Sequence, residues 1–150
     1  MTFTREDLLG KRLMAIDYGE RRTGIAVCDE MHIVVSSRPL ILTSPSIVKD
    51  VLQLAISDRV EVIIVGMPLM HDERVTPIME TIRAFVMQLQ ELSSIPVYTA
   101  DEAFSTSEAR QIMIASGMKR KKRQTKGVKD QVAAAVILKR VLVEIGSATL

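Results

Sequence analysis

Four acidic residues have the type and placement that suit the binding of a hard metal ion. Asp17 directly follows one apolar run, Asp101 and Glu102 follow another, and Asp130 stands at or just before the start of an apolar helical pattern. In open α/β sheets the ligand crevice lies outside the carboxyl ends of the strands, so these groups could meet at one rim. Two or three carboxylates there would bind Mg²⁺ or Mn²⁺, with waters completing the shell. A pair of such ions can activate a water and stabilise the leaving oxygen in phosphodiester hydrolysis.

Each of these acids also has a structural explanation. The turn after Asp17 contains Gly19 and Gly24, which adopt turn conformations that side chains resist, and an Asp at such a turn often bonds to its backbone N–H groups. Asp130 near a helix N-terminus would interact with the helix dipole, a contribution of roughly 0.3 to 1 kcal/mol. Asp101 and Glu102 could be solvated loop residues. The residue types alone leave both explanations open.

Positive charge is concentrated near the end of the sequence. Residues 1–116 carry 11 Lys and Arg against 16 Asp and Glu, whereas residues 117–150 carry 9 against 2. Most of that excess forms one run with no apolar face, which comprises Lys119, Arg120, Lys121, Lys122, Arg123, Lys126 and Lys129. Such a run is either a solvated surface loop or a contact for nucleic-acid phosphates, and we expect Arg21 and Arg22 in the first turn to join that contact. No aromatic residues are interleaved with the run, so base stacking is not indicated.

Length and composition favour one domain over residues 1–150. With 47% hydrophobic residues the chain can bury a sizeable core. No apolar stretch approaches the ~20 residues that a membrane span needs, and we expect a cytoplasmic protein that does not bind membranes. The single Cys28 lies in an apolar strand pattern and is predicted to be a buried core residue. His32 and His71 have no partner motif, so we expect exposed or structural roles for them, and we expect the methionines, among them Met67, Met79, Met87 and Met113, to fill the core.

The apolar periodicity predicts an α/β fold with a mixed sheet covered by helices on both faces. Three successive strands come first, followed by helices alternating with two further strands. The strands are predicted at 12–17, 24–29, 32–42, 62–66 and 95–99. The helices are predicted after Ser44-Pro45 to about residue 57, from Thr76-Pro77 to about 92, over 105–117, and over the apolar pattern 132–145 that follows the basic run. Right-handed crossovers are expected for the parallel part of the sheet.

The sequence resembles the YqgF family, also called RuvX, over nearly its whole length. The resemblance rests on the Asp17-Tyr18-Gly19 turn with Arg22, Thr23 and Gly24, on Val65-Gly66-Met67-Pro68-Leu69, on Asp101-Glu102 with Phe104-Ser105-Thr106 and Glu108-Ala109, and on Asp130-Gln131-Val132-Ala133-Ala134-Ala135 before Ile137-Leu138. It implies a ribonuclease H-like three-layer fold with a mixed five-stranded sheet. It also implies a metal-dependent endonuclease that matures the 5′ end of precursor 16S rRNA or resolves DNA four-way junctions.

Carried over residue by residue, the resemblance implies that Asp17, Glu102 and Asp130 are the catalytic, metal-binding acids, with Asp101 a neighbouring candidate ligand. A site for two Mg²⁺ or Mn²⁺ ions is expected, with structured RNA or branched DNA as the partner of a monomer or homodimer. Two departures concern substrate contacts. Ala103 stands where the family usually has an arginine, and the segment 70–73 differs from the family's Asn-Met-Asp-Gly.

Two functions of other classes remain open at this point. Turns of the form Asp-x-Gly-x-x-x-x-Gly also bind ATP phosphates in the actin and sugar-kinase superfamily, although those proteins close two such domains around the nucleotide. A non-catalytic RNA-binding or ribosome-assembly protein would need only the basic run, with structural acids. Divalent-metal-dependent cleavage separates the nuclease from both alternatives.

Overall fold

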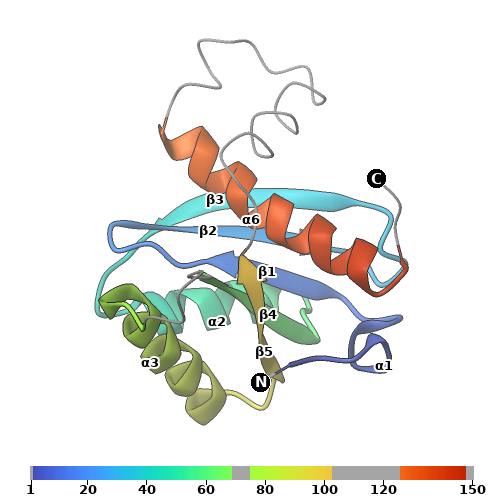
Figure 1. Ribbon diagram of the computed structural model, residues 1–150, viewed down its shortest axis with the longest axis horizontal. Helices are drawn as coiled ribbons and strands as arrows, with labels where there is room; N and C mark the ends of the chain where they lie inside the picture. Colours follow the sequence, from blue (N-terminus) through green and yellow to red (C-terminus); the bar gives the residue numbers. More distant parts are fainter. Residues whose placement is uncertain (1, 69–74, 103–125, 148–150) are drawn as a thin grey trace.

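The computed structural model describes residues 2–68, 75–102 and 126–147, which form a five-stranded mixed sheet with helices on both faces (Figure 1). This arrangement confirms the predicted α/β fold class. The sheet order is β3-β2-β1-β4-β5. In chain order the elements are α1 (Arg5–Leu8), β1 (Leu13–Asp17), β2 (Arg22–Cys28), β3 (Val35–Leu42), α2 (Ile47–Ser57), β4 (Val62–Pro68), α3 (Pro77–Leu92), β5 (Val97–Glu102) and α6 (Lys126–Glu144).

The central strand β1 joins an antiparallel half of the sheet to a parallel half. β1, β2 and β3 form the predicted meander, in which Asp17 pairs with Gly24. β4 is parallel to both β1 and β5, with Ile16 opposite Val65. The apolar runs of β1 and β4 are uninterrupted because both strands are covered on both faces, as is typical of the inner strands of α/β sheets.

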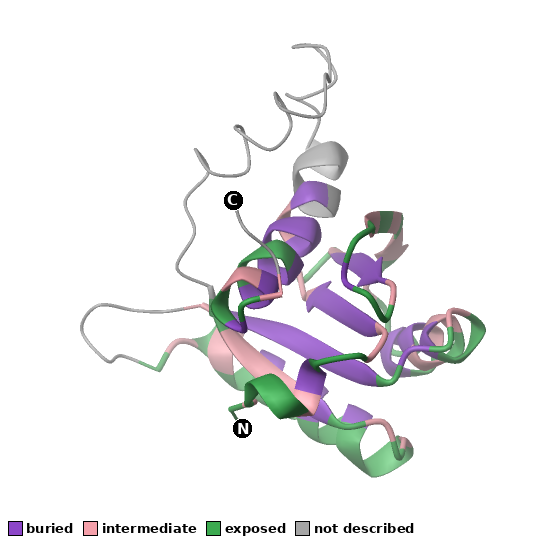
Figure 2. Ribbon diagram, turned by 90° about the vertical axis from the view of Figure 1, so that its right-hand side faces the viewer, coloured by how far each residue is buried: buried purple, intermediate pink, exposed green. Residues whose placement is uncertain are grey.

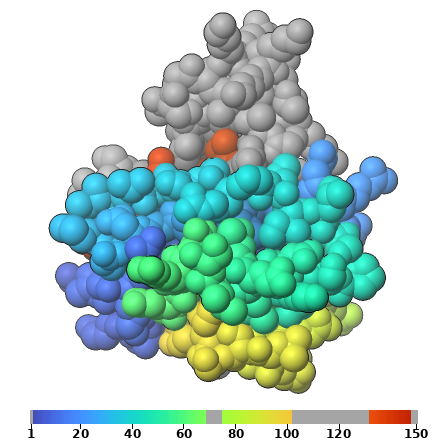
Figure 3. All heavy atoms as spheres, turned by 180° about the vertical axis from the view of Figure 1, so that it is seen from behind, coloured from blue at the N-terminus to red at the C-terminus, as the bar shows by residue number. Residues whose placement is uncertain are grey.

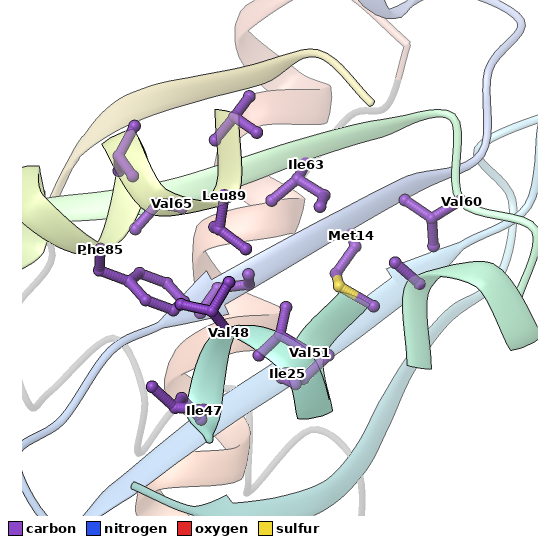
Figure 4. Close-up of a cluster of buried hydrophobic side chains, with 14 of the residues drawn as sticks. Met14, Ile25, Ile47, Val48, Val51, Val60, Ile63, Val65, Phe85 and Leu89 are labelled. Atoms are coloured by element: carbon purple, nitrogen blue, oxygen red, sulfur yellow. The ribbon is translucent and has the colours of Figure 1, made fainter. Parts of the chain in front are cut away.

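The strand residues alternate between two hydrophobic layers, one on each face of the sheet. Figure 2 shows the buried inner strands in purple. One layer packs under α2 and α3 and includes Met14, Ile16, Ile25, Ile63, Val65, Val97, Val48, Val51, Phe85 and Leu89, most of which are labelled in Figure 4. The other layer packs under α6 and includes Leu13, Ala15, Ala26, Val62, Ile64, Ala134, Leu138 and Leu142. Neighbouring residues of one strand therefore belong to opposite layers.

An ion pair fastens the edge strand β3 to the end of α2. Arg38 Nε lies 3.0 Å from Asp58 Oδ2, and the two side chains are only partly exposed. Figure 3, which shows the molecule from behind, has the cyan residues of β3 and the blue-green residues of α2 in one continuous surface. The pair therefore reinforces the packing of α2 against the antiparallel half of the sheet.

The third strand begins at Val35, three residues later than predicted, because Asp29 organises the preceding connection. Its Oδ1 accepts the N–H groups of Ile33 at 2.9 Å and Val34 at 2.8 Å, and its Oδ2 accepts that of Met31 at 3.2 Å. The bond from Val34, followed in importance by those from Ile33 and Met31, lowers the pKa of the Asp29 carboxyl. Residues 32–34 therefore belong to the hairpin connection between β2 and β3.

Several other boundaries also differ from the predicted ones. β2 begins at Arg22 rather than residue 24, β5 spans Val97–Glu102 rather than 95–99, and α1 was not predicted. Helix α6 begins at Lys126, so Lys126 and Lys129 lie in its first turn and not in a loop. Asp130 is consequently the fifth helical residue, beyond the first turn in which the helix dipole acts. The helix predicted over 105–117 lies outside the described residues.

The predicted core roles hold for Cys28 and for three methionines, Met14, Met67 and Met79. Cys28 is 3% exposed, and burial raises the pKa of its thiol to about 11, as expected of a core residue. Met67 is buried and Met79 packs against the layer under α2 and α3. The prediction was wrong for Met87, which is 58% exposed on the outer side of α3, and for Met31, which is 71% exposed. Met113, like His71, lies outside the described residues.

His32 has the structural role that the sequence predicted, at the end of the sheet where β1 starts. Nδ1 of its buried ring is hydrogen-bonded to Ser147 Oγ at 3.0 Å. Its Nε2–H donates to the carbonyl oxygen of Lys11 at 2.9 Å. Gly146 lies beside the side chain of Arg5 at the same place. The residues that follow α6 are thus tied to the residues that precede β1.

None of the helices in the part of the chain that the structure describes is long and apolar enough to span a membrane.

Candidate functional site

The predicted acids of β1 and β5 lie at one edge of the sheet. β1, β4 and β5 run parallel and end at Asp17, Pro68 and Glu102. The register sets Ile16 beside Val65, and Gly66 beside Ala100, so Asp17 and Glu102 end strands that flank β4. With neighbouring strands about 4.8 Å apart, those two strands are about 10 Å apart across the sheet. This edge is the place where open α/β sheets bind ligands.

Strand alternation assigns the acidic positions to different faces. Leu13 and Ala15 belong to the layer under α6, and Asp17 is the next position of the same set. On β5 that layer takes Tyr98 and Ala100, so position 102 continues the set. The side chain of Glu102 lies outside the described residues, and its place rests on the backbone register. The register therefore groups positions 17 and 102 on the face that α6 covers.

Asp101 belongs to the opposite set of β5 positions. It alternates with Val97, which packs in the layer under α2 and α3, and its own side chain is exposed. Neighbouring strand residues point to opposite faces of a sheet. Asp101 and Asp17 thus lie near the same edge of the sheet, but the register assigns their side chains to opposite faces.

The direction of α6 brings its first turns toward the same edge. The hydrogen bonds of His32 hold the residues after α6 close to Lys11, where β1 begins, so α6 runs opposite to β1 (Figure 1). Along β1 the rise from Lys11 to Asp17 is about 20 Å, and along α6 the rise from Glu144 back to Asp130 is about 21 Å. Position 130 stands one turn before Ala134, which is fully buried against the sheet. The side chain of Asp130, like that of Glu102, lies outside the described residues.

Among the side chains that the structure describes, no three His, Cys, Asp or Glu residues form a group that could hold a metal ion. Of the four predicted ligands, only Asp17 and Asp101 have described side chains, and they belong to opposite faces. The predicted ligand set contains only carboxylates, which are the donors that Mg²⁺ and Mn²⁺ prefer. The metal site therefore stays a prediction that rests on the backbone positions of β1, β5 and α6.

The turn that follows Asp17 is held on both sides. The ring of Tyr18 packs on Phe85 with centroids 4.9 Å apart, which attaches the start of the turn to α3. Thr43, the first residue after β3, donates its Oγ1–H to the carbonyl oxygen of Gly19 at 2.7 Å. Gly19 itself lies against the backbone of Arg22, where no side chain would fit. Asp17 thus leads into a backbone segment with little freedom.

Gly19→Ala is expected to distort this turn. The added Cβ would overlap the backbone carbonyl oxygen of Arg22, so the turn backbone must move. We expect a loss of about 1 to 3 kcal/mol of unfolding free energy in urea, the usual cost of overpacking. Gly10→Ala shows the cost of backbone strain alone, because Gly10 has a left-handed φ of +75° whereas a Cβ there meets nothing within 4 Å. Lys139→Ala, an exposed helical position, is the neutral control. Equal stability of Gly19→Ala and the wild type would contradict the close packing of the turn.

The predicted nucleic-acid-binding residues fall in three groups. Arg21 is exposed in the turn after Asp17, whereas Arg22 is half-buried at the start of β2, opposite Leu42. Lys126 and Lys129 lie in the first turn of α6, and their side chains lie outside the described residues. Lys119, Arg120, Lys121, Lys122 and Arg123 lie wholly outside them. Of all these residues, the structure brings Arg21 and Arg22 next to the predicted acid.

Sequence reasoning missed Thr43 altogether. Its hydroxyl contacts the carbonyl oxygen of Gly19 and lies 2.8 Å from Thr23 Oγ1. Gly19 and Thr23 are close to each other in the sequence, but both are at least 20 residues from Thr43. The only signal in the sequence is a threonine that directly follows a predicted strand and precedes Ser44-Pro45, which predicts a helix start. Contacts between a turn and a distant strand end leave no periodic pattern.

The sheet order defines a ribonuclease H-like fold, and solved structures are similar to it. The structure of Thermus thermophilus RuvC in complex with a Holliday junction substrate is similar with a TM-score of 0.57 at 18% identity, and covers 93% of this chain and 98% of that one. The Fowlpox virus resolvase in complex with Holliday junction DNA is similar with a TM-score of 0.57 at 12% identity, and covers 89% of this chain and 97% of that one. At these identities the similarity concerns the fold.

Sequence comparisons give the family. Residues 11–144 match the model of the RuvX family, which is described as Holliday junction resolvase. A relative from Bacteroides fragilis is 36% identical over 132 residues, which cover 87% of this chain and 95% of the relative. A relative from Halothermothrix orenii is 39% identical over 133 residues, with 87% and 94% covered. Both carry the name of a candidate pre-16S rRNA nuclease. The chain belongs to the RuvX family.

Proposed function

We propose that this chain is a metal-dependent endonuclease of the cytoplasm that hydrolyses phosphodiester bonds in precursor 16S rRNA. The observation that carries the proposal is the register of β1 and β5, which groups Asp17 and Glu102 at one edge and on the face that α6 covers. The RuvX family and the names of the relatives supply the reaction class and the substrate. A mature 16S rRNA end requires only a single-strand cut, which one subunit can make.

We propose Asp17, Glu102 and Asp130 as the residues that hold two Mg²⁺ or Mn²⁺ ions. Bound there, such ions would supply an activated water and stabilise the leaving oxygen of the scissile phosphate. The three proposed oxygen donors would come from β1, β5 and α6, and the first of them precedes a restrained turn. Asp101 belongs to the opposite face, so we assign the β5 ligand to Glu102.

We propose that the basic residues bind the phosphate backbone on either side of the cut. Arg21 stands exposed beside the end of β1, and Lys126 and Lys129 begin α6. Each phosphate contact that is lost should lower the slope of log affinity against log salt by about one unit. Replacing Lys121 and Lys122 together by Ala is therefore expected to reduce RNA affinity and to lower that slope by about two units. An unchanged slope would show that these two lysines are solvated surface.

One assay separates the candidate functions. Precursor 16S RNA and a four-way DNA junction are incubated side by side with the protein, with Mg²⁺, with Mn²⁺ and with EDTA. The proposal predicts RNA cleavage that requires divalent metal. Preferential cleavage of the junction would favour a resolvase, and the resolvase would be expected to be a homodimer. RNA binding without cleavage in any metal would favour an assembly protein, and tight ATP binding by calorimetry would favour a nucleotide-binding domain.

A further inference from the structure

Thr43 holds the turn after Asp17 through two of its carbonyl groups. Its Oγ1–H donates to the carbonyl oxygen of Gly19 at 2.7 Å, and its backbone N–H donates to the carbonyl oxygen of Arg21 at 2.9 Å. Thr43, which directly follows β3, is therefore hydrogen-bonded to two residues of the turn, Gly19 and Arg21. The short hydroxyl bond has the length typical of a well-formed O–H···O contact.

Thr23 completes a directional chain of hydroxyl groups. Thr43 Oγ1 and Thr23 Oγ1 lie 2.8 Å apart, and Thr23 is fully buried. A hydroxyl has one proton to donate, and that of Thr43 is used by Gly19. Thr23 must therefore donate to Thr43, so the order of donation runs from β2 through Thr43 to the turn. Removing the Thr43 hydroxyl would break the bond to Gly19 and leave the buried Thr23 hydroxyl without this acceptor, which is costly.

We propose that Thr43 is a positioning residue for Asp17. The residue lies outside the set of predicted acids and basic side chains, and it acts through Gly19 on the backbone that directly follows Asp17. Pairing with β2 and β4 fixes the backbone of β1 that leads to Asp17. After Asp17, Tyr18 packs on Phe85, and Thr43 hydrogen-bonds to Gly19. Metal ligands need placement within about 0.5 Å and 10–20°, which requires supporting hydrogen bonds of this kind. The inference rests on the proposed role of Asp17 as a metal ligand.

The test compares Thr43→Val, which keeps the shape and loses the hydroxyl, with Thr43→Ser, which keeps the hydroxyl. Thr81→Val is the matched control, because the Thr81 hydroxyl bonds to a carbonyl within its own helix, that of Pro77, at 3.0 Å. For each variant, kcat and KM for cleavage of precursor 16S RNA with Mn²⁺, and the Mn²⁺ Kd without RNA, are measured. Circular dichroism and Tm establish that each variant is folded.

Thr43→Val is expected to weaken Mn²⁺ binding and lower kcat by about tenfold each, the lower range for removal of a residue that orients a ligand. KM for RNA should change less than about twofold, since phosphate contacts are untouched. Thr43→Ser should restore both values to within about threefold of the wild type, and Thr81→Val should leave them unchanged. Where Thr43→Val does not fold, Thr43→Ala, which leaves room for a water beside Gly19, gives the same comparison.

Wild-type kcat and Mn²⁺ affinity in a folded Thr43→Val protein would overturn the inference, as would a Thr43→Ser protein as defective as Thr43→Val. A wild-type protein that binds Mn²⁺ but cleaves no RNA would overturn the proposed nuclease alone, because the Mn²⁺ titration still compares Thr43→Val with the wild type. A wild-type protein that cleaves RNA without binding Mn²⁺ at Asp17 would overturn the inference and the assignment of Asp17 as a ligand but leave the proposed nuclease standing, and Asp17→Asn identifies that case by its unchanged Mn²⁺ affinity.

Discussion

Replacement of Asp17 by Asn is expected to reduce metal-dependent cleavage of precursor 16S RNA by at least about 100-fold. Asn keeps the shape of the side chain but removes the charge that holds a hard cation. Metal-ion catalysis contributes several kcal/mol to the transition state, and about 2.7 kcal/mol corresponds to 100-fold in rate. The measurement is single-turnover cleavage over a range of Mg²⁺ and Mn²⁺ concentrations, with urea unfolding to confirm that Asp17→Asn is folded.

Asp101→Asn is the matched control for Asp17→Asn. Asp101 lies next to the end of β5, which is separated from β1 by β4. It is also an aspartate, and it belongs to the opposite face of the sheet. Its replacement is expected to change the cleavage rate by less than about threefold, as for a substitution away from the reacting groups. Full activity of Asp17→Asn would show that Asp17 only completes the turn. Equal loss in both variants would contradict the assignment of faces.

Leu138→Ala is expected to produce the largest loss of stability, about 3 kcal/mol within the 2–5 kcal/mol usual for a buried leucine. Leu138 is fully buried on α6, in the layer that includes Leu13 and Ala26. The strands beneath it are held by their hydrogen bonds, so they cannot move far to close the cavity that the substitution leaves. The measurement is the urea midpoint and slope at equilibrium. A loss is expected without a change in slope, which would show that stability rather than compactness has changed.

Lys139→Ala, at the next position of the same helix, is the control for Leu138→Ala. Lys139 is exposed, so its replacement is expected to change stability by no more than about 0.5 kcal/mol. A loss below about 1 kcal/mol in Leu138→Ala would mean that α6 is not packed on the sheet as described. Because α6 carries position 130, such a result would also weaken the assignment of Asp130 to the metal site.

The strands and long helices were predictable because their apolar residues follow clear periods. The run 62–66 predicted a strand covered on both faces, and β4 confirms it. The predicted ends of strands and helices were wrong where the backbone hydrogen bonds continue beyond the apolar residues. β5 pairs with β4 as far as Glu102, although its apolar pattern fades after Thr99, and α6 begins at Lys126, although the apolar pattern that predicts this helix begins only at residue 132. Pairing of backbone groups does not depend on side-chain polarity.

The candidate site was predicted as an edge of the sheet, and the register refines it. Asp101 and Glu102 are equivalent in the sequence, and a shift of one residue in strand pairing exchanges the faces they occupy. The structure distinguishes them, because Val97 packs in one hydrophobic layer and Tyr98 and Ala100 pack in the other. Thr43 could not be found from the sequence, because its bonds to Gly19 and Thr23 connect a strand end to a turn that comes much earlier in the chain.

The junction of Lys11, His32 and Ser147 has a practical consequence for the experiments above. It fastens the segments before β1 and after α6 at the end of β1 that lies about 20 Å from Asp17 along the strand. A fluorophore or a tether to a sensor chip attached beside residue 5 or residue 147 would leave the acidic edge open to a long RNA. Affinities recorded with such immobilised protein should equal those measured free in solution.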